Sequence, residues 1–286
     1  MKAFTFLTPR GREEAVGLLQ DHGADARVIA GGQSLLLALK DRSARPTVLV
    51  SLAGLPELFG IRTEGDELVV GATTTYAALS RSGRPGWHAE IAAVAGNLAD
   101  RPVRTMGTIG GALCAADPRF DMLTLVTGVG ARVETLSSEG VRLLTPAELF
   151  HPDGGTRLQP GEILTAVRFP GVGAFDAVAF EKFRQRTFDA ALASVLCAVR
   201  TSPDGLLTDL RLTVGATTPV PVVATDACAP LIGTAAGDVD PEALAGRVVD
   251  EVLGGCGDGP SVRYSRELVP ALVRRALRRV LPNTRS

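Results

Sequence analysis

Two short stretches with paired glycines place the strongest constraint on how this chain can fold. The first spans residues 27–37 with the sequence RVIAGGQSLLL, and the second spans residues 105–113 with the sequence TMGTIGGAL. The first pattern predicts an apolar strand, a tight turn and a helix capped by Ser34. Paired glycines allow positive φ and remove the Cβ atoms that would keep a ligand from the backbone. Because successive N–H groups in such turns can point at an anion, we expect one extended, doubly anionic ligand held between both stretches.

Length, charge and hydropathy exclude several classes of protein. At 286 residues the chain is long enough for two domains, and its net charge of −1 gives no general attraction to nucleic acid. We interpret the basic run at residues 274–279 as a solvated helix face. No apolar run approaches the length of about 20 residues that spans a bilayer, and the first residues lack the apolar centre of a signal peptide. We therefore expect a cytoplasmic protein with no membrane or nucleic-acid partner.

The cysteines and histidines do not form a metal-binding pattern. The four cysteines are far apart and never form a CxxC pair, and the three histidines have no ligand-like neighbour at helical spacing. We therefore expect no iron–sulfur cluster, zinc site or other metal site within this chain.

The order of apolar segments and turn signals predicts an α+β protein in two domains. Hairpin turns are expected at residues 63–66 and 137–140, and a glycine-rich connection at residues 171–173 suggests a boundary. We expect a first domain at residues 1–173, made of two α+β subdomains at roughly 1–55 and 56–173. Residues 174–286 are expected to form a smaller α+β domain, an antiparallel sheet with helices on one face.

Known nucleotide motifs do not explain the glycines. No GxGxxG follows a strand and no GxxxxGK[ST] occurs, so neither a Rossmann site nor a P-loop is indicated. Taken alone, the two glycine pairs leave open both a diphosphate site and plain structural turns.

Over nearly its whole length the sequence resembles the FAD-binding medium subunit of molybdenum hydroxylases, of the xanthine dehydrogenase and carbon monoxide dehydrogenase type. The resemblance implies a PCMH-type FAD-binding domain followed by a flavoprotein C-terminal domain. Its main motifs are FTFLTP at residues 4–9, AGGQSL at 30–35, GATT at 71–74, TIGG at 108–111, ADP at 116–118 and GEIL at 161–164.

The resemblance also implies a set of FAD-binding residues, with FAD held non-covalently. The first stretch would wrap the pyrophosphate and ribityl chain, the second would close on the diphosphate from the other side, and Asp121 would bind a cofactor hydroxyl. Leu164 and Lys182 correspond to positions near the flavin ring, and Leu98 to an apolar contact. The implied residues are Val28, Ile29, Ala30, Gly31, Gly32, Gln33, Ser34, Leu35, Leu98, Thr108, Ile109, Gly110, Gly111, Asp121, Leu164 and Lys182.

Some of these residues also have plain structural interpretations. Asp121 is also typical of an ordinary helix start, and Lys182 alone would be read as a solvated strand residue. The sequence departs from the family at Ala112, which replaces a small polar residue. It also departs at Pro102 and Thr105, which replace polar residues around Arg104.

The resemblance implies an FAD-dependent oxidoreductase subunit with no catalytic side chain of its own. It would pass electrons from molybdopterin-binding and 2Fe-2S partner subunits through FAD to an acceptor such as NAD. A stand-alone FAD oxidoreductase acting on a small organic substrate is the alternative, because a fold and a cofactor do not fix the substrate. A third possibility is a flavin-free scaffold in which the glycine stretches are turns only.

Overall fold

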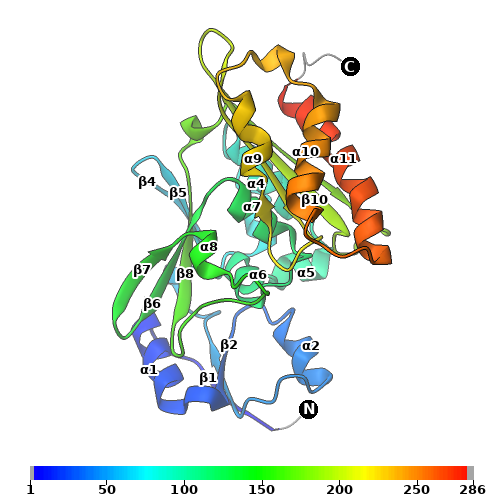
Figure 1. Ribbon diagram of the computed structural model, residues 1–286. Helices are drawn as coiled ribbons and strands as arrows, with labels where there is room; N and C mark the ends of the chain where they lie inside the picture. Colours follow the sequence, from blue (N-terminus) through cyan, green and yellow to red (C-terminus); the bar gives the residue numbers. More distant parts are fainter. Residues whose placement is uncertain (1–2, 282–286) are drawn as a thin grey trace.

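The computed structural model describes residues 3–281, which form three β-sheets with helices packed between and around them (Figure 1). The first sheet has three parallel strands in the order β1-β3-β2. The elements of this N-terminal part are β1 (Thr5–Leu7), α1 (Arg12–His22), η1 (Gly23–Asp25), β2 (Ala26–Ile29), α2 (Leu35–Lys40), β3 (Val48–Ser51) and η2 (Pro56–Leu58).

Helix α1 joins the first sheet to the second. Ala15, Val16 and Leu19 lie on one helical stripe, and all three are buried in a small core that also contains Leu136 and Ile163 of the second sheet. The N-terminal part is therefore fixed to the rest of the molecule through apolar contacts on α1.

The second sheet has five antiparallel strands in the order β4-β5-β8-β6-β7. Both hairpins expected from the sequence are present, with residue 64 opposite 67 and residue 137 opposite 140. The strands are β4 (Ile61–Glu64), β5 (Glu67–Gly71), β6 (Arg132–Ser137), β7 (Gly140–Leu144) and β8 (Ile163–Phe169).

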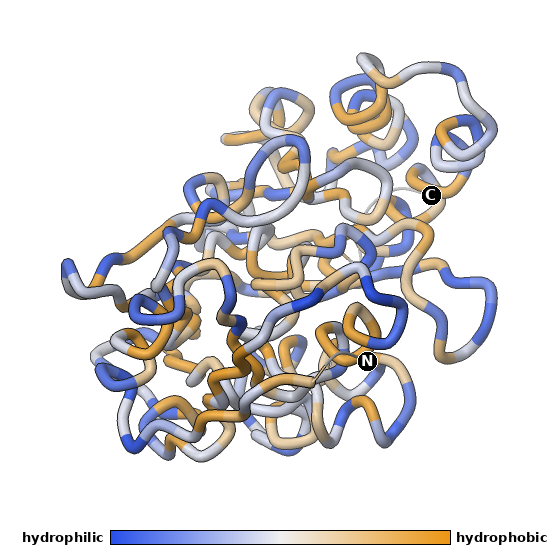
Figure 2. Tube along the Cα trace, turned by 90° about the horizontal axis from the view of Figure 1, so that it is seen from below, coloured by the Kyte–Doolittle hydropathy of each residue, from blue (hydrophilic) through white to orange (hydrophobic). Residues whose placement is uncertain are grey.

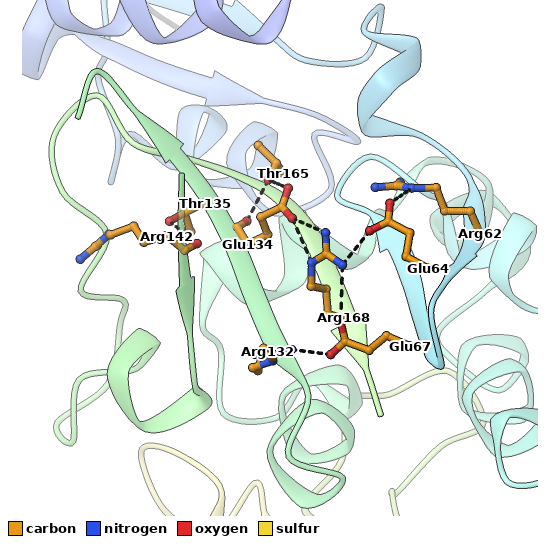
Figure 3. A network of polar contacts seen from close by, with 9 residues as sticks. All are labelled: Arg62, Glu64, Glu67, Arg132, Glu134, Thr135, Arg142, Thr165 and Arg168. Carbon is orange, nitrogen blue, oxygen red and sulfur yellow. Dashed lines mark hydrogen bonds and ion pairs between the residues drawn. The ribbon is translucent and has the colours of Figure 1, made fainter. Parts of the chain in front are cut away.

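Charged side chains link the strands of this sheet across one face (Figure 3). Arg168 on β8 donates to Glu134 on β6 at 2.8 Å and to Glu64 on β4 at 2.8 Å. Arg132 on β6 donates to Glu67 on β5 at 2.6 Å. Because the Arg168 side chain is only 16% exposed and has acidic partners on three other strands, the network stabilises the sheet more than isolated surface pairs would.

Short helices fill the space between the second and third sheets. Their apolar side chains share a core with the second sheet, through residues such as Val70 and Val167, and with the third sheet through Leu196. The helices are α3 (Tyr76–Leu79), α4 (His88–Gly96), α5 (Arg101–Met106), α6 (Ile109–Ala115), α7 (Asp121–Gly128) and α8 (Pro146–Leu149).

The third sheet has four antiparallel strands in the order β12-β11-β10-β9, and the long helices α10 and α11 cover one of its faces (Figure 1). The expected α+β fold with a C-terminal antiparallel sheet is confirmed. Only short helices occur in the segment at residues 220–232. The elements are η3 (Val172–Ala174), β9 (Ala177–Phe183), β10 (Ala193–Thr201), β11 (Leu207–Gly215), β12 (Val222–Val223), α9 (Thr225–Cys228), η4 (Ala229–Leu231), η5 (Ala236–Asp238), α10 (Pro241–Leu253) and α11 (Pro260–Val280).

Strand β10 is buried on both faces. Val195, Cys197 and Val199 belong to the core under α10 and α11, whereas Leu196 and Ala198 belong to the central core. This alternation follows the two-residue period of a strand. Figure 2 shows the outer loops mainly in hydrophilic colours, with hydrophobic residues on the interior segments. Within residues 3–281, no helix is both long enough and apolar enough to cross a bilayer.

Helix α7 covers the other face of the third sheet at very close range. Thr124 on α7 is fully buried, and its hydroxyl lies 3.0 Å from the hydroxyl of Ser194 on β10. A Cβ atom added at Gly215, at the end of β11, would lie 1.9 Å from Thr124 Oγ1. Glycine is therefore required at position 215 because helix and sheet meet there.

We expect Gly215→Ala to destabilise the protein by about 1–3 kcal/mol, because the methyl group forces α7 away from the sheet. The matched control is Gly246→Ala on the exposed face of α10, where an added Cβ has no neighbour within 4 Å among the described residues. That control should stabilise the protein by up to about 1 kcal/mol, because alanine favours a helix more than glycine. Urea denaturation measures both changes, and two effects of the same sign would contradict the packing described.

Candidate functional site

The first glycine stretch connects β2 to α2. Val28 and Ile29 are the last residues of β2, and Leu35 is the first residue of α2. The segment between them, residues 30–34, is half-buried along its whole length. Gly32 has φ +71°, a conformation that glycine adopts with little strain. The strand, turn and helix predicted from the sequence are therefore present at this position.

The backbone N–H groups of residues 31–35 have no partner among the residues that the structure describes. N–H groups at the start of a helix have no partner within that helix, so those at the start of α2 are available to a ligand, together with those of Gly31 and Gly32. Ser34 also makes no side-chain cap bond to α2. This segment therefore fits an anionic ligand rich in acceptor oxygens, such as a diphosphate.

The two glycine stretches touch each other directly. A Cβ atom added at Gly31 would lie 1.8 Å from the carbonyl oxygen of Met106 and 3.1 Å from Gly107 Cα. Gly31 is thus required by the contact between the first stretch and the end of α5. The paired glycines therefore allow two backbone segments to approach closely, and they also leave room for a ligand.

The amides of the second stretch are mostly used by the protein itself. Ile109 N–H donates to Thr74 O at 3.1 Å, Gly110 N–H to Ala72 O at 2.9 Å, and Gly111 N–H to Thr108 Oγ1 at 3.1 Å. An added Cβ at Gly110 would lie 2.8 Å from Ala72 Cβ. Thr108 N–H is the one amide in residues 108–111 without a partner among the described residues. The first stretch therefore offers most of the free donors.

A buried ion pair lies between the third sheet and α7. Lys182 Nζ on β9 is hydrogen-bonded to Asp121 Oδ2 at the start of α7. The side chains are only 8% and 2% exposed. Burial raises the pKa of Asp121 above the usual range of aspartic acid, and the positive charge of Lys182 opposes that rise. The pair brings together two of the residues that the resemblance implied, although they are 61 positions apart.

A turn after α4 connects this pair to the glycine stretches. Lys182 Nζ also donates to the carbonyl oxygen of Asn97 at 3.1 Å. Leu98 follows Asn97 directly, and Arg104 on α5 donates to the carbonyl oxygen of Leu98 at 2.7 Å. Because the end of α5 contacts Gly31, a continuous series of contacts runs from the first glycine stretch to Asp121.

Two of the implied residues, Leu164 and Leu98, differ in how exposed they are. Leu164 on β8 is 3% exposed and belongs to the central core, together with Ile109. Leu98 is partly buried and packs against the same core. In the described structure, Leu164 therefore acts as a core residue beneath α6, whereas Leu98 retains an accessible surface.

The residues implied by the resemblance do not include Asn97, Arg104 and Arg184. Arg184 donates to Asn97 O at 3.0 Å and to Asn97 Oδ1 at 2.9 Å. The available signal was Asp100 followed by Pro102, because an N-cap residue with proline in the first turn predicts a new helix. That helix, α5, directs Arg104 back to the preceding turn.

We expect Lys182→Met to destabilise the protein by about 3–5 kcal/mol at neutral pH, because it leaves the Asp121 charge buried without a partner. The pKa of Asp121 in the folded variant then rises further above its unfolded value of about 4. Stability is therefore highest at low pH and is lost as the pH rises from the unfolded pKa to the raised folded pKa.

Urea denaturation at several pH values tests this prediction. The control is the double variant Asp121→Asn with Lys182→Met, which removes the titrating group and should abolish the added pH dependence. If Lys182→Met has the same pH profile as the double variant, Asp121 does not titrate in a buried site.

Comparisons with known proteins agree with this geometry. The family model of the FAD binding domain in molybdopterin dehydrogenase matches residues 2–172. The model of the CO dehydrogenase flavoprotein C-terminal domain matches residues 178–280. Together the two models cover nearly the whole chain.

One relative and two solved structures show matches over almost their full lengths. The carbon monoxide dehydrogenase medium chain of Afipia carboxidovorans is 34% identical over 282 residues, 97% of this chain and 96% of the relative. The reconstituted CO dehydrogenase from Oligotropha carboxidovorans aligns with a TM-score of 0.89 at 31% identity, with 99% of each chain covered. Quinoline 2-oxidoreductase from Pseudomonas putida 86 aligns with a TM-score of 0.85 at 30% identity and the same coverage. The chain belongs to the family of FAD-binding oxidoreductase subunits of the molybdenum hydroxylases.

Proposed function

We propose that this chain is the flavoprotein subunit of a molybdenum hydroxylase complex. It holds FAD non-covalently and passes electrons from a molybdenum and iron–sulfur partner through FAD to an acceptor such as NAD. The observation that supports this most directly is the run of five backbone amides at residues 31–35 for which residues 3–281 supply no acceptor. These donors match the acceptor oxygens of a dinucleotide pyrophosphate.

The proposed site assigns different parts of FAD to different elements. Residues 28–35 hold the pyrophosphate and ribityl chain, and residues 108–111 close on the diphosphate through Thr108 N–H. Asp121 binds a cofactor hydroxyl, Leu98 offers apolar surface near the ring, and Lys182 places positive charge beside it. Leu164 lies near the ring as a residue of the underlying core. FAD itself supplies the two-electron chemistry, so the protein needs only to bind, orient and electrostatically tune it.

The buried position of Lys182 supports its proposed influence on the flavin. Its ammonium group is removed from water and held by Asp121 and Asn97 O. A fixed charge in a low-dielectric site interacts more strongly with a nearby ring than a solvated charge does. Lys182 would thereby stabilise negative charge on the reduced flavin.

Partner subunits follow from what related proteins are called. Relatives include a medium chain, subunits of dehydrogenase complexes and a xanthine dehydrogenase FAD-binding subunit. For this chain we infer cytoplasmic molybdopterin-binding and 2Fe-2S partner subunits and a small-molecule acceptor. We also infer a division into an FAD-binding domain at residues 1–173, with subdomains at roughly 1–55 and 56–173, and a C-terminal domain at 174–286.

Native purification from the source cells tests the complex. The expected preparation is yellow and contains FAD, molybdenum, iron and two further polypeptides. A flavin-containing chain that oxidises a small organic substrate without metal would support the stand-alone alternative, and a chain that takes up no FAD would contradict both enzyme hypotheses.

We expect Gly31→Ala to lower FAD affinity at least roughly tenfold, because its Cβ cannot coexist with Met106 O and the free amides must move. Gly54→Ala is the control, since an added Cβ there has no neighbour within 4 Å among the described residues. Titration of flavin-free protein with FAD, followed by flavin fluorescence, measures both. Equal affinity of both variants would show that the first stretch does not hold FAD.

A further inference from the structure

The turn that follows α4 is held by an unusual number of cationic side chains. Lys182 and Arg184 from β9 donate to Asn97 O at 3.1 and 3.0 Å. Arg104 from α5 donates to the next two carbonyl oxygens, those of Leu98 and Ala99. Three consecutive carbonyl groups at the C-terminal end of one helix therefore face three cations. The partial negative charge of that helix end makes these interactions favourable.

Arg104 makes the shortest of these contacts. Its Nη1 atom lies 2.7 Å from Leu98 O and 2.6 Å from Ala99 O, so one nitrogen bridges two successive peptide units. Ala99 has φ +36°, which is uncommon for a residue with a side chain. Such a backbone conformation persists only where the surrounding structure holds it in place. Residues with strained backbone conformations are common at functional sites. The Arg104 guanidinium is the group that fixes Ala99 here.

Both ends of α5 are anchored. At its start, the Asp100 side chain accepts from Val103 N–H at 2.9 Å and caps the helix. At its end, the Met106 carbonyl packs against Gly31 so closely that no Cβ would fit. A single helix of six residues therefore contacts the first glycine stretch at one end and holds the Leu98 turn through Arg104.

We propose that Arg104 is a positioning residue that fixes Leu98 against the flavin end of FAD, at a set distance from the loop that binds the diphosphate. The proposal rests on the proposed function and deepens it. Arg104 acts through the backbone of Leu98 and Ala99 and does not itself contact the cofactor.

The two ends of the cofactor should respond differently to a change at Arg104. ADP has the diphosphate but no flavin, so it depends on the amides of residues 31–35 and of Thr108 and not on the surface that Leu98 offers. FAD depends on those amides and also on the surface that Leu98 offers. Loss of Arg104 should therefore weaken FAD binding while ADP binding stays the same.

The test uses the full-length chain freed of flavin, with Arg104→Met and Arg104→Lys. We expect Arg104→Met to weaken FAD binding roughly tenfold, the effect of losing charge-assisted hydrogen bonds. The visible absorbance spectrum of the bound flavin should shift toward that of free FAD, and ADP affinity by calorimetry should stay within about twofold. Arg104→Lys keeps a cationic donor and should recover part of the FAD affinity.

Arg101→Met is the matched control. Arg101 lies on the same helix and is exposed, and its side chain makes no hydrogen bond or ion pair with the residues that the structure describes. The Arg101→Met variant removes the same charge and should change neither ligand's affinity.

If Arg104→Met behaves like Arg101→Met with FAD, or weakens ADP and FAD equally, the positioning role is wrong. If the unchanged chain binds neither FAD nor ADP, the proposed function itself fails. If Arg104→Met does not fold, the Lys variant and its FAD-to-ADP ratio decide the question.

Discussion

The contact between Gly31 and the Met106 carbonyl is the constraint on which the candidate site depends. It brings two segments 75 positions apart into backbone contact, and it requires that position 31 has no side chain. With the turn pressed against the end of α5, the N–H groups of residues 31–35 find no acceptor in the described protein. The same contact therefore creates both the shape of the turn and its unpaired donors.

The Lys182–Asp121 pair provides a second link of a different kind. Moving two charges from water into the interior costs several kcal/mol per ion unless each finds a partner. Here β9 supplies the cation and α7 the anion, so the buried charge on the third sheet is paired with the buried charge on a central helix. Arg279 on α11 adds a peripheral link, because it contacts Glu90 on α4 at 2.9 Å and Glu181 on β9 at 3.2 Å.

Local sequence signals predicted much of the fold but fewer of the contacts. The strand before Gly31, the helix from Leu35 to Lys40 and both hairpin turns follow from apolar runs and turn residues, and the structure confirms them. In the second stretch, N–H groups donate to the carbonyl groups of Ala72 and Thr74. These acceptors lie more than 30 positions away in the sequence, so no local pattern predicts the contacts. Helix α5 has only six residues, so its apolar periodicity is too brief to indicate a helix, and only the N-cap Asp100 and Pro102 mark its start.

The position of β10 has a consequence for the independence of the two halves. Its side chains alternate between two hydrophobic cores, and α7 of the first half lies on the sheet of the second. A fragment ending near residue 173 would expose the fully buried apolar side of α7 to water. In the remaining fragment, the face of the third sheet that α7 covers would be exposed. We therefore expect the two family segments to melt in a single cooperative transition, so that neither is a module that evolution could exchange without rebuilding the other.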